Sequence, residues 1–314
     1  MKLGELISDY VGFKQSLGMS FETNASLLRA FCRMVGNAEV EQINFDSILR
    51  YLYGNGGASY CYRKYQALSG LYRYATARGY VIRSSFPETK PRLPPAYVPY
   101  IYTPQELSSL MKAAETLDAS GSHIDALTFR TLLLLLFNTG LRIGEALSLK
   151  LADVSLSENL LVIRNSKFGK SRLVPINLRL GELLGGYIAK KHAAPLDYDQ
   201  DPPVFVYRNG LPISHWCVEM TFRRLCNHCG IRRDDGSRYQ PRLHDIRHTF
   251  AVSRLLEWYR NGYDVQRFLP HLSTYLGHVE IASTQSYLRM IPQLLREAAS
   301  LFEKYALSEA NNVR

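Results

Sequence analysis

The sequence predicts a mainly α-helical protein with a small β-hairpin or sheet, divided into two domains. Its 314 residues exceed the size at which a single hydrophobic core usually stops growing, although length alone leaves one domain open. Apolar residues recur three and four positions apart, which is the period of an amphipathic helix. A proline-rich stretch without this period separates two helical parts.

The first domain is expected to cover residues 1–87 as several short helices. Between Asp46 and Glu88 the chain has no acidic residue, whereas basic residues and tyrosines are interleaved there. This pattern suits helices that pack on one side and bind phosphates on the other. A basic surface that serves only solubility explains the segment equally well when it is considered alone. The candidate phosphate contacts are Arg63, Lys64, Arg73 and Arg78.

An extended linker is predicted at residues 88–102, where prolines are frequent, and its Lys90 and Arg92 are further candidate contacts. The second domain, residues 103–314, begins where Thr103 can cap a helix that has Pro104 at its first position. Residues 160–164 and 171–176 are expected to form a β-hairpin around a turn at 165–169.

The composition indicates a polyanionic partner. The formal net charge is +10, and basic side chains that neutralise phosphates gain affinity by releasing counterions. Nucleic acid is the leading interpretation and an anionic membrane surface is the second. The longest apolar run, 132–137, is far below the roughly 20 residues of a membrane-spanning helix, and the first residues lack the features of a signal peptide. We therefore expect a cytoplasmic, nucleoid-associated protein with no membrane contact.

Five cysteines, an odd number, do not suggest a disulfide framework. Cys226 and Cys229 form a CxxC motif with His228 between them, which is a pattern that zinc sites use. The motif lies in a stretch of helical character and no second pair follows, so packing in the core is the favoured interpretation. No metal and no other cofactor is expected.

Candidate catalytic residues occur in separate segments. TGLRIGEAL (139–147) has a glycine that ends one helix and Arg142 in the first turn of the next, three residues before Glu145. LHDIRHTFAV (243–252) predicts a helix on which His244 and Arg247 can reach a common ligand. A guanidinium offers a fork of donors to phosphate oxygens, and an imidazole can move a proton near neutral pH. Each motif is weak when taken alone.

LGHVEIASTQSYL (276–288) contains His278 after a glycine and Tyr287 nine residues later. Since the chain has 21 tyrosines, only the order of the whole set singles out this one. Together with SKFGKSRLVPI (166–176), the segments resemble the ordered motifs of the tyrosine recombinases of the phage integrase family. The resemblance covers roughly residues 103–290, and the helical part before the linker resembles the family's core-binding domain more loosely.

The resemblance implies roles for residues at the matching positions. Arg142 and Arg247 would clamp the scissile phosphate, and Glu145 would orient Arg142 or the histidines. The other implied active-site residues are the hairpin lysine Lys167, the histidines His244 and His278, and the nucleophile Tyr287. Lys170 competes with Lys167, and His248 competes with His244; the first of each pair is favoured.

Charge grows on the phosphate oxygens in the transition state, so fixed cations lower the barrier. Two arginines and one acid give a divalent ion no obvious cage. A phenol with a pKa near 10 must lose its proton during attack, for which His244 is the candidate base, and Lys167 is the candidate donor to the departing hydroxyl. His278 would hold the phosphate by a hydrogen bond.

The resemblance implies a two-domain clamp on double-stranded DNA, with a helical core-binding domain and a catalytic domain. The implied reaction is site-specific strand exchange through a 3′-phosphotyrosyl intermediate, carried out by a homotetramer with one dimer per recombination site. A type IB topoisomerase-like activity and a non-cutting DNA-binding regulator are the alternatives.

An apolar stripe between Ile291 and Tyr305 predicts a C-terminal helix, docked either on its own domain or on a neighbouring protomer. The run from Arg247 to Gly277 is longer than in compact members.

Overall fold

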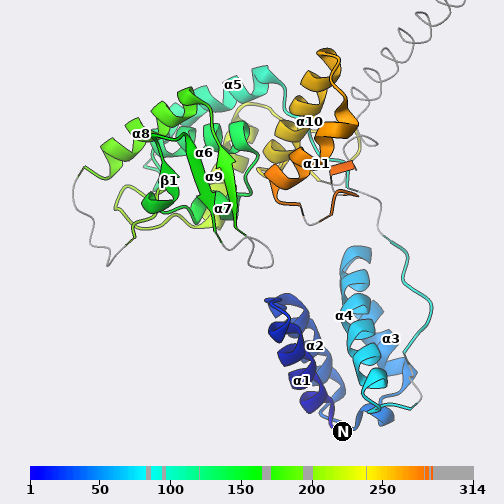
Figure 1. Ribbon diagram of the computed structural model, residues 1–314. Coiled ribbons are helices and arrows are strands. Elements are labelled where there is room, and N and C mark those ends of the chain that lie inside the picture. The colour runs from blue at the N-terminus through cyan, green and yellow to red at the C-terminus, as the bar shows by residue number, and fades with distance from the viewer. Residues whose placement is uncertain are drawn as a thin grey trace, which may run out of the picture. The chain divides into compact units, whose positions relative to one another are not determined.

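The computed structural model describes residues 1–82, 86–93, 97–119, 121–164, 171–193, 201–237, 239–278, 280–282 and 284–285. The chain divides into two compact units, Met1–Tyr97 and Val98–Arg314, and each has its own hydrophobic core (Figure 1). Lys167 and Lys170 of the predicted hairpin turn lie outside the described residues, as do Tyr287 and the C-terminal apolar stripe. Every helix within the described part is too short or too polar to span a bilayer.

Helices form the described part of the first unit, as predicted. They are α1 (Leu3–Ser16), α2 (Glu22–Val35), α3 (Phe45–Gly54) and α4 (Ala58–Ala77), with a 3₁₀ turn η1 (Val40–Gln42) before α3. α3 begins where the Asn44 side chain accepts a hydrogen bond from the Ser47 amide at 2.8 Å, as an N-cap does. α4 packs against the other three helices, and its Leu68 and Leu71 are fully buried.

Lys64 of α4 lies in the core of this unit, with only 4% of its surface exposed. Its Nζ donates to the carbonyl oxygens of Tyr51 at 2.7 Å and Asn55 at 3.0 Å, at the end of α3. Burial lowers the pKa of this ammonium group. A cation there satisfies carbonyls that a helix leaves without partners. The expectation that Lys64 contacts phosphates is therefore corrected: its charge holds the end of α3.

The second unit is a helical domain with one small sheet. Its described elements are α5 (Pro104–Ala113), η2 (Ala114–Leu117), α6 (Ala126–Thr139), α7 (Ile143–Leu147), η3 (Leu151–Asp153), β1 (Val154–Ser155), β2 (Leu160–Ile163), β3 (Arg172–Pro175), α8 (Leu178–Lys191), α9 (His215–His228), α10 (Asp245–Arg260) and α11 (Val265–Leu276). Thr103 caps α5 as predicted, accepting from the Glu106 amide at 3.2 Å. Figure 1 shows α8 and the pair α10 and α11 at opposite ends of this unit, with α6 and the strands between them.

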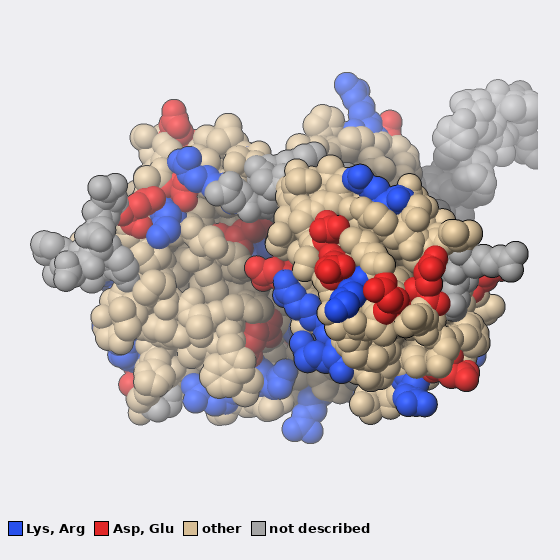
Figure 2. All heavy atoms as spheres, turned by 90° about the horizontal axis from the view of Figure 1, so that it is seen from below, with Lys and Arg blue, Asp and Glu red and all other residues tan. Residues whose placement is uncertain are grey.

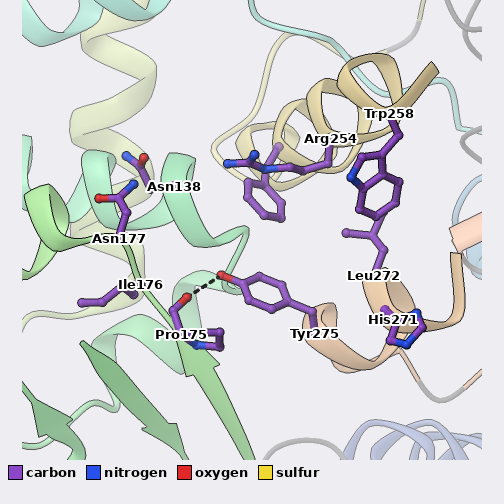
Figure 3. Close-up of a pocket in the computed structure, with 10 residues that line it drawn as sticks. Asn138, Pro175, Ile176, Asn177, Arg254, Trp258, His271, Leu272 and Tyr275 are labelled. Atoms are coloured by element: carbon purple, nitrogen blue, oxygen red, sulfur yellow. Dashed lines mark hydrogen bonds between the residues drawn. The ribbon is translucent and has the colours of Figure 1, made fainter. Parts of the chain in front are cut away.

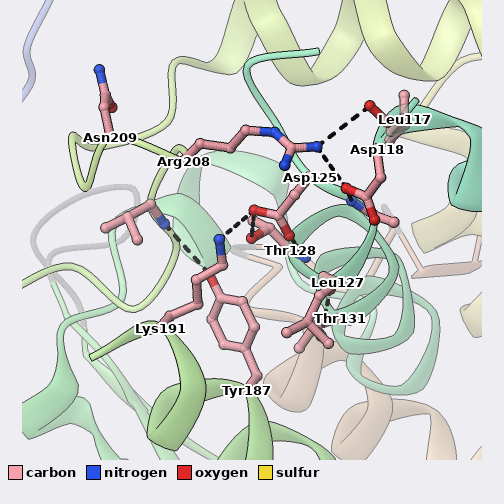
Figure 4. A network of polar contacts seen from close by, with 12 residues as sticks. Leu117, Asp118, Asp125, Leu127, Thr128, Thr131, Tyr187, Lys191, Arg208 and Asn209 are labelled. Atoms are coloured by element: carbon pink, nitrogen blue, oxygen red, sulfur yellow. Dashed lines mark hydrogen bonds and ion pairs between the residues drawn. The ribbon is translucent and has the colours of Figure 1, made fainter. Parts of the chain in front are cut away.

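α6 runs through the core of the second unit, and its Phe129, Leu132 and Leu135 are fully buried. Its N-terminus is held by Asp125, whose Oδ1 accepts from the Thr128 amide at 2.8 Å. Oδ2 of Asp125 accepts from the Thr128 hydroxyl and from Lys191 of α8 (Figure 4). This buried network fixes the position of α6 against α8.

The sheet has the strand order β1-β2-β3, with both pairs antiparallel. Leu161 of β2 pairs with Val174 of β3, and both side chains are fully buried. The predicted hairpin strands are thus confirmed, each slightly shorter than expected. The sequence did not indicate β1, since its two residues are too few to show an alternating pattern.

α9 carries Cys226, which is 3% exposed and belongs to the core, in agreement with a packing role. The long run from Arg247 to Gly277 contains most of α10 and all of α11, which are joined by a short turn that contains Gly262 with φ +70°. These two helices bury a small core of their own, which includes Leu255 and Leu269. The run is therefore helical on both sides of this turn.

Candidate active site

Arg247 of α10 joins the ends of two other helices. Its side chain is almost completely buried, with 2% of the residue exposed. Nη1 donates to the carbonyl oxygen of Gly140 at 2.7 Å, and Nη2 donates to that of Leu276 at 2.6 Å. These carbonyls end α6 and α11, where a helix has unpaired acceptors and partial negative charge. The guanidinium thus fixes three helices relative to one another.

Gly140 and Gly277, the C-caps of α6 and α11, both adopt the left-handed conformation, with φ of +61° and +69°. A Cβ atom at Gly140 would lie 2.5 Å from Cδ1 of Phe250. A Cβ atom at Gly277 would lie 2.8 Å from Nη1 of Arg172. Glycine is required at both ends because of the backbone angle and because other groups approach closely.

Arg142 is the N-cap of α7, and its guanidinium contacts the C-terminal end of α11, as that of Arg247 does. Its Nη1 donates to Oε1 of Glu145 at 2.8 Å, and its Nη2 donates to the carbonyl oxygen of Gly277 at 3.2 Å. The side chain is 32% exposed. Since a guanidinium has five N–H donors, Arg142 can hold these acceptors and still offer donors to an anion from solution.

Arg172 of β3 also belongs to this site, although no pattern in the sequence indicated it. Its Nη1 and Nη2 donate to Oε1 and Oε2 of Glu145 at 3.0 and 2.9 Å, and its Nε donates to the carbonyl oxygen of Tyr275 at 2.9 Å. Burial by itself raises the pKa of Glu145, but hydrogen bonds from Arg172 and from the Arg142 amide outweigh it and lower the pKa to about 2. Glu145 is therefore ionised at neutral pH.

His244 is the N-cap of α10, and its ring lies edge-on to that of His248, with centroids 5.0 Å apart. Burial, together with the positive charge of the neighbouring Arg247, lowers the pKa of His244 to about 4. Burial also lowers the pKa of His248, to about 3. Both imidazoles are therefore neutral near pH 7, the form that can accept a proton.

His278 directly follows Gly277. Its Nδ1 lies 2.7 Å from the hydroxyl oxygen of the fully buried Thr284, which fixes the orientation of the ring. Burial lowers the pKa of His278 to about 4, and the positive charges of Arg247 and Arg142 act in the same direction. This imidazole is neutral at pH 7 as well.

The structure thus gathers five of the predicted residues around the ends of α6 and α11, namely Arg142, Glu145, His244, Arg247 and His278. Three guanidinium groups converge there, including that of Arg172, and Glu145 bridges two of them. Such an arrangement is suited to binding an anion and to stabilising negative charge that develops on it. The two remaining predictions, Lys167 and Tyr287, lie outside the described residues.

A pocket of about 320 Å³ adjoins this cluster, between the end of β3 and the helices α10 and α11 (Figure 3). Tyr275 reaches across it, since its hydroxyl donates to the carbonyl oxygen of Pro175 at 3.2 Å. Its ring stacks on that of Phe250, with centroids 5.8 Å apart. Trp258 and Leu272 complete an apolar wall. Tyr275 therefore attaches α11 to both β3 and α10.

The basic residues predicted to contact DNA differ in exposure. Lys64 is buried, as described above, whereas the other five are exposed: Arg63, Arg73, Arg78, Lys90 and Arg92. In the view of Figure 2, Lys and Arg side chains occur on the described surface in groups between larger uncharged areas. The exposed residues are available for contacts with phosphates, and Lys64 is not.

Residues 101–293 match the sequence profile described as the phage integrase family. The protein named integrase/recombinase y4rE, of Sinorhizobium fredii, is 33% identical over 306 residues, which cover 95% of this chain and 94% of that protein. The protein named y4rB of the same organism is 38% identical over 208 residues, covering 66% of each chain.

Solved structures share the fold. The Tn1549 transposon integrase, in complex with transposon right end DNA, has a TM-score of 0.71 and 16% identity, covering 98% of this chain and 100% of that chain. A lambda integrase tetramer bound to a Holliday junction has a TM-score of 0.65 and 19% identity, covering 91% of this chain and 77% of that chain.

Proposed function

This chain belongs to the phage integrase family, and on that premise we propose that it is a site-specific recombinase that cuts and rejoins double-stranded DNA through a tyrosine nucleophile. The observation that carries this proposal is the convergence of Arg142 and Arg247 on consecutive carbonyls, those of Gly277 and Leu276, directly before His278. Residues from distant segments thereby surround one place that suits a phosphate.

In the proposed site Arg142 is the main contact to the scissile phosphate, since a third of its side chain is exposed. Arg247 adds its positive charge from its buried position, while its Nη atoms hold the ends of α6 and α11. Both charges favour the transition state, in which negative charge on the phosphate oxygens increases. His278, oriented by Thr284, is placed to donate its other ring N–H to the same phosphate.

The proposed reaction is a transesterification. The Tyr287 oxygen bonds to phosphorus while the bond from phosphorus to the 5′ oxygen breaks, so the DNA 3′ phosphate becomes linked to tyrosine. The neutral imidazole of His244 accepts the phenol proton, and Lys167 gives a proton to the departing 5′ oxygen. Attack by a second 5′ hydroxyl reverses these steps and joins a new strand without a further energy source.

We propose duplex DNA as the partner, with one dimer at each recombination site and a tetramer during exchange, and a place at the nucleoid in the cytoplasm. The fold shared with the lambda integrase tetramer on a Holliday junction supports this assembly. The exposed basic residues of the first unit and the linker, such as Arg63 and Lys90, are proposed contacts to the phosphate backbone.

A suicide substrate with a nick near the cleavage position tests the proposal. The protein is expected to become covalently attached to this DNA, and Tyr287→Phe is expected to abolish attachment while DNA binding persists. Attachment by the Tyr287→Phe protein would contradict the assigned nucleophile. A non-cutting regulator would bind the DNA without attachment, and a topoisomerase-like enzyme would relax supercoils without exchanging strands.

The same substrate tests the absence of a catalytic metal. Among the described residues placed in the proposed site, the one acid is Glu145, which is already paired with two arginines. Covalent attachment should therefore proceed equally well with excess EDTA. Loss of attachment in EDTA, restored by added magnesium, would contradict the metal-free mechanism.

A further inference from the structure

Arg172 of β3 contacts two helices at the proposed active site, α7 and α11. Its fork of Nη atoms binds both oxygens of Glu145, and its Nε binds the carbonyl oxygen of Tyr275, two residues before Gly277. The side chain is only 10% exposed. Because three donor nitrogens are already occupied by protein acceptors, Arg172 is poorly placed to bind DNA itself.

Glu145 has a complete set of donors in this arrangement. Oε1 accepts from Nη1 of Arg142 and of Arg172, and Oε2 accepts from the Arg142 amide and from Nη2 of Arg172. Each oxygen therefore receives one bond from each arginine. If Arg172 is removed, each oxygen loses a partner, and the buried carboxylate retains Arg142 alone.

The contact with Tyr275 fixes the end of α11. The Tyr275 hydroxyl returns to β3 at Pro175 (Figure 3). β3 and α11 are therefore joined twice, at Arg172 and at Pro175. Arg142 binds the carbonyl of Gly277 two residues further along. The position of His278 thus depends on the carbonyl that Arg172 holds.

From these contacts we infer that Arg172 is a positioning residue of the active site, which acts through Glu145 on Arg142 and through the Tyr275 carbonyl on His278. The inference rests on the proposed function, since it concerns the rate of the same cleavage step. A bidentate guanidinium is needed for this role. A lysine keeps the charge but offers no fork, so it cannot hold two carboxylate oxygens and a carbonyl together.

The test compares Arg172→Gln and Arg172→Lys with the wild-type protein, by the single-turnover rate of covalent attachment to the nicked substrate at saturating DNA. We expect Arg172→Gln to slow attachment roughly 100-fold, the effect of a displacement of about 1 Å at a reacting centre, with DNA affinity unchanged. The attachment rate of Arg172→Lys should lie between the rates of the wild-type protein and of Arg172→Gln. Arg130→Gln removes an exposed arginine paired with Glu115 and is the matched control, expected to react at the wild-type rate.

Two further readouts separate positioning from a merely structural role. Loss of Arg172 removes donors that keep Glu145 ionised, so the acid limb of the pH–rate profile should shift to higher pH in Arg172→Gln. In the Glu145→Gln background, the same substitution should have a smaller effect than in the wild-type protein, since only the contact with the Tyr275 carbonyl is left to lose. Thermal unfolding of each variant shows whether it is folded at the assay temperature.

A wild-type rate in Arg172→Gln overturns this inference. So does an equal loss in Arg172→Gln and Arg172→Lys with an unshifted acid limb, because that pattern indicates only a weakened fold. If the wild-type protein itself fails to become attached to DNA, the proposed function fails, and this inference fails with it. If the wild-type protein reacts and Arg172→Gln reacts equally fast, only the inference about Arg172 fails.

Discussion

The Nη2 of Arg142 donates to the carbonyl oxygen of Gly277 at 3.2 Å, which joins two residues 135 positions apart in the sequence. Arg142 precedes α7, and Gly277 ends α11 immediately before His278. A phosphate that binds the exposed part of Arg142 is therefore brought close to His278. The backbone at Gly277, as well as the side chains, determines the geometry of the site.

Gly277→Ala is predicted to reduce both stability and cleavage. An alanine in the left-handed conformation costs about 1–2 kcal/mol, and its Cβ would displace the guanidinium of Arg172. Gly262→Ala is the control, because Gly262 has a similar φ, +70°, with open space around it. Unfolding and covalent attachment are measured for both variants. Both should be destabilised, and only Gly277→Ala should be slow in attachment; equal rates would contradict the role of this close contact.

The free protein is predicted to keep the histidines of the proposed active site neutral down to acidic pH. Burial lowers the pKa of His244 and of His278 to about 4, whereas an exposed histidine has a pKa near 6.5. Because the unfolded chain binds protons first, stability should decline as the pH falls from about 6.5 toward 4. NMR titration of the imidazoles in the folded protein without DNA measures these pKa values. Midpoints near 6.5 for these two rings would contradict the buried arrangement.

Lys64 and Arg63 are adjacent but are predicted to respond differently to substitution. Lys64→Gln should destabilise the first unit by about 1–3 kcal/mol, because two carbonyls at the end of α3 lose their donor. Arg63→Gln should leave unfolding unchanged and reduce the salt dependence of DNA binding by about one unit of slope. Urea unfolding and binding at several salt concentrations distinguish the two effects. A reduced salt slope with unchanged stability in Lys64→Gln would restore Lys64 as a phosphate contact.

Removal of Lys191 is predicted to destabilise the second unit strongly. The carboxylate of Asp125 would remain buried at the start of α6 without its cation, which typically costs about 3–5 kcal/mol. The double variant Asp125→Asn with Lys191→Met should recover much of this loss, because no uncompensated charge is left. Chemical unfolding of the two single variants and the double variant measures the coupling. Additive losses would show that the pair does not act as a unit.

The sequence predicted most of the helices, the hairpin strands and five of the residues that meet in the site. Local patterns sufficed for these features, because helix periodicity, capping residues and the glycines at 140 and 277 are visible within short segments. The order of the motifs then indicated which arginines and histidines belong together.

Arg172 and Lys64 could not be assigned from the sequence, because their roles depend on long-range contacts. Arg172 reaches acceptors 27 and 103 positions away. Lys64 appeared to belong to a positive face, but its position on α4 points into the core. A basic residue in a helix can hold the carbonyls of another helix or bind phosphate, and only the packing decides between these roles.

The turn between α10 and α11 differs from the two glycine-capped ends in its tolerance of insertions and deletions. Arg247 holds Gly140 and Leu276 at fixed positions, so a residue added or lost at either end would rotate a helix by about 100° and remove the carbonyls from the guanidinium. The contacts of Arg142, Arg172 and Arg247 described above hold the ends of α6 and α11, which lie away in sequence from the turn at Gly262. We therefore expect family members to vary in length at this turn and to keep constant the spacing from each glycine to its neighbouring arginine or histidine.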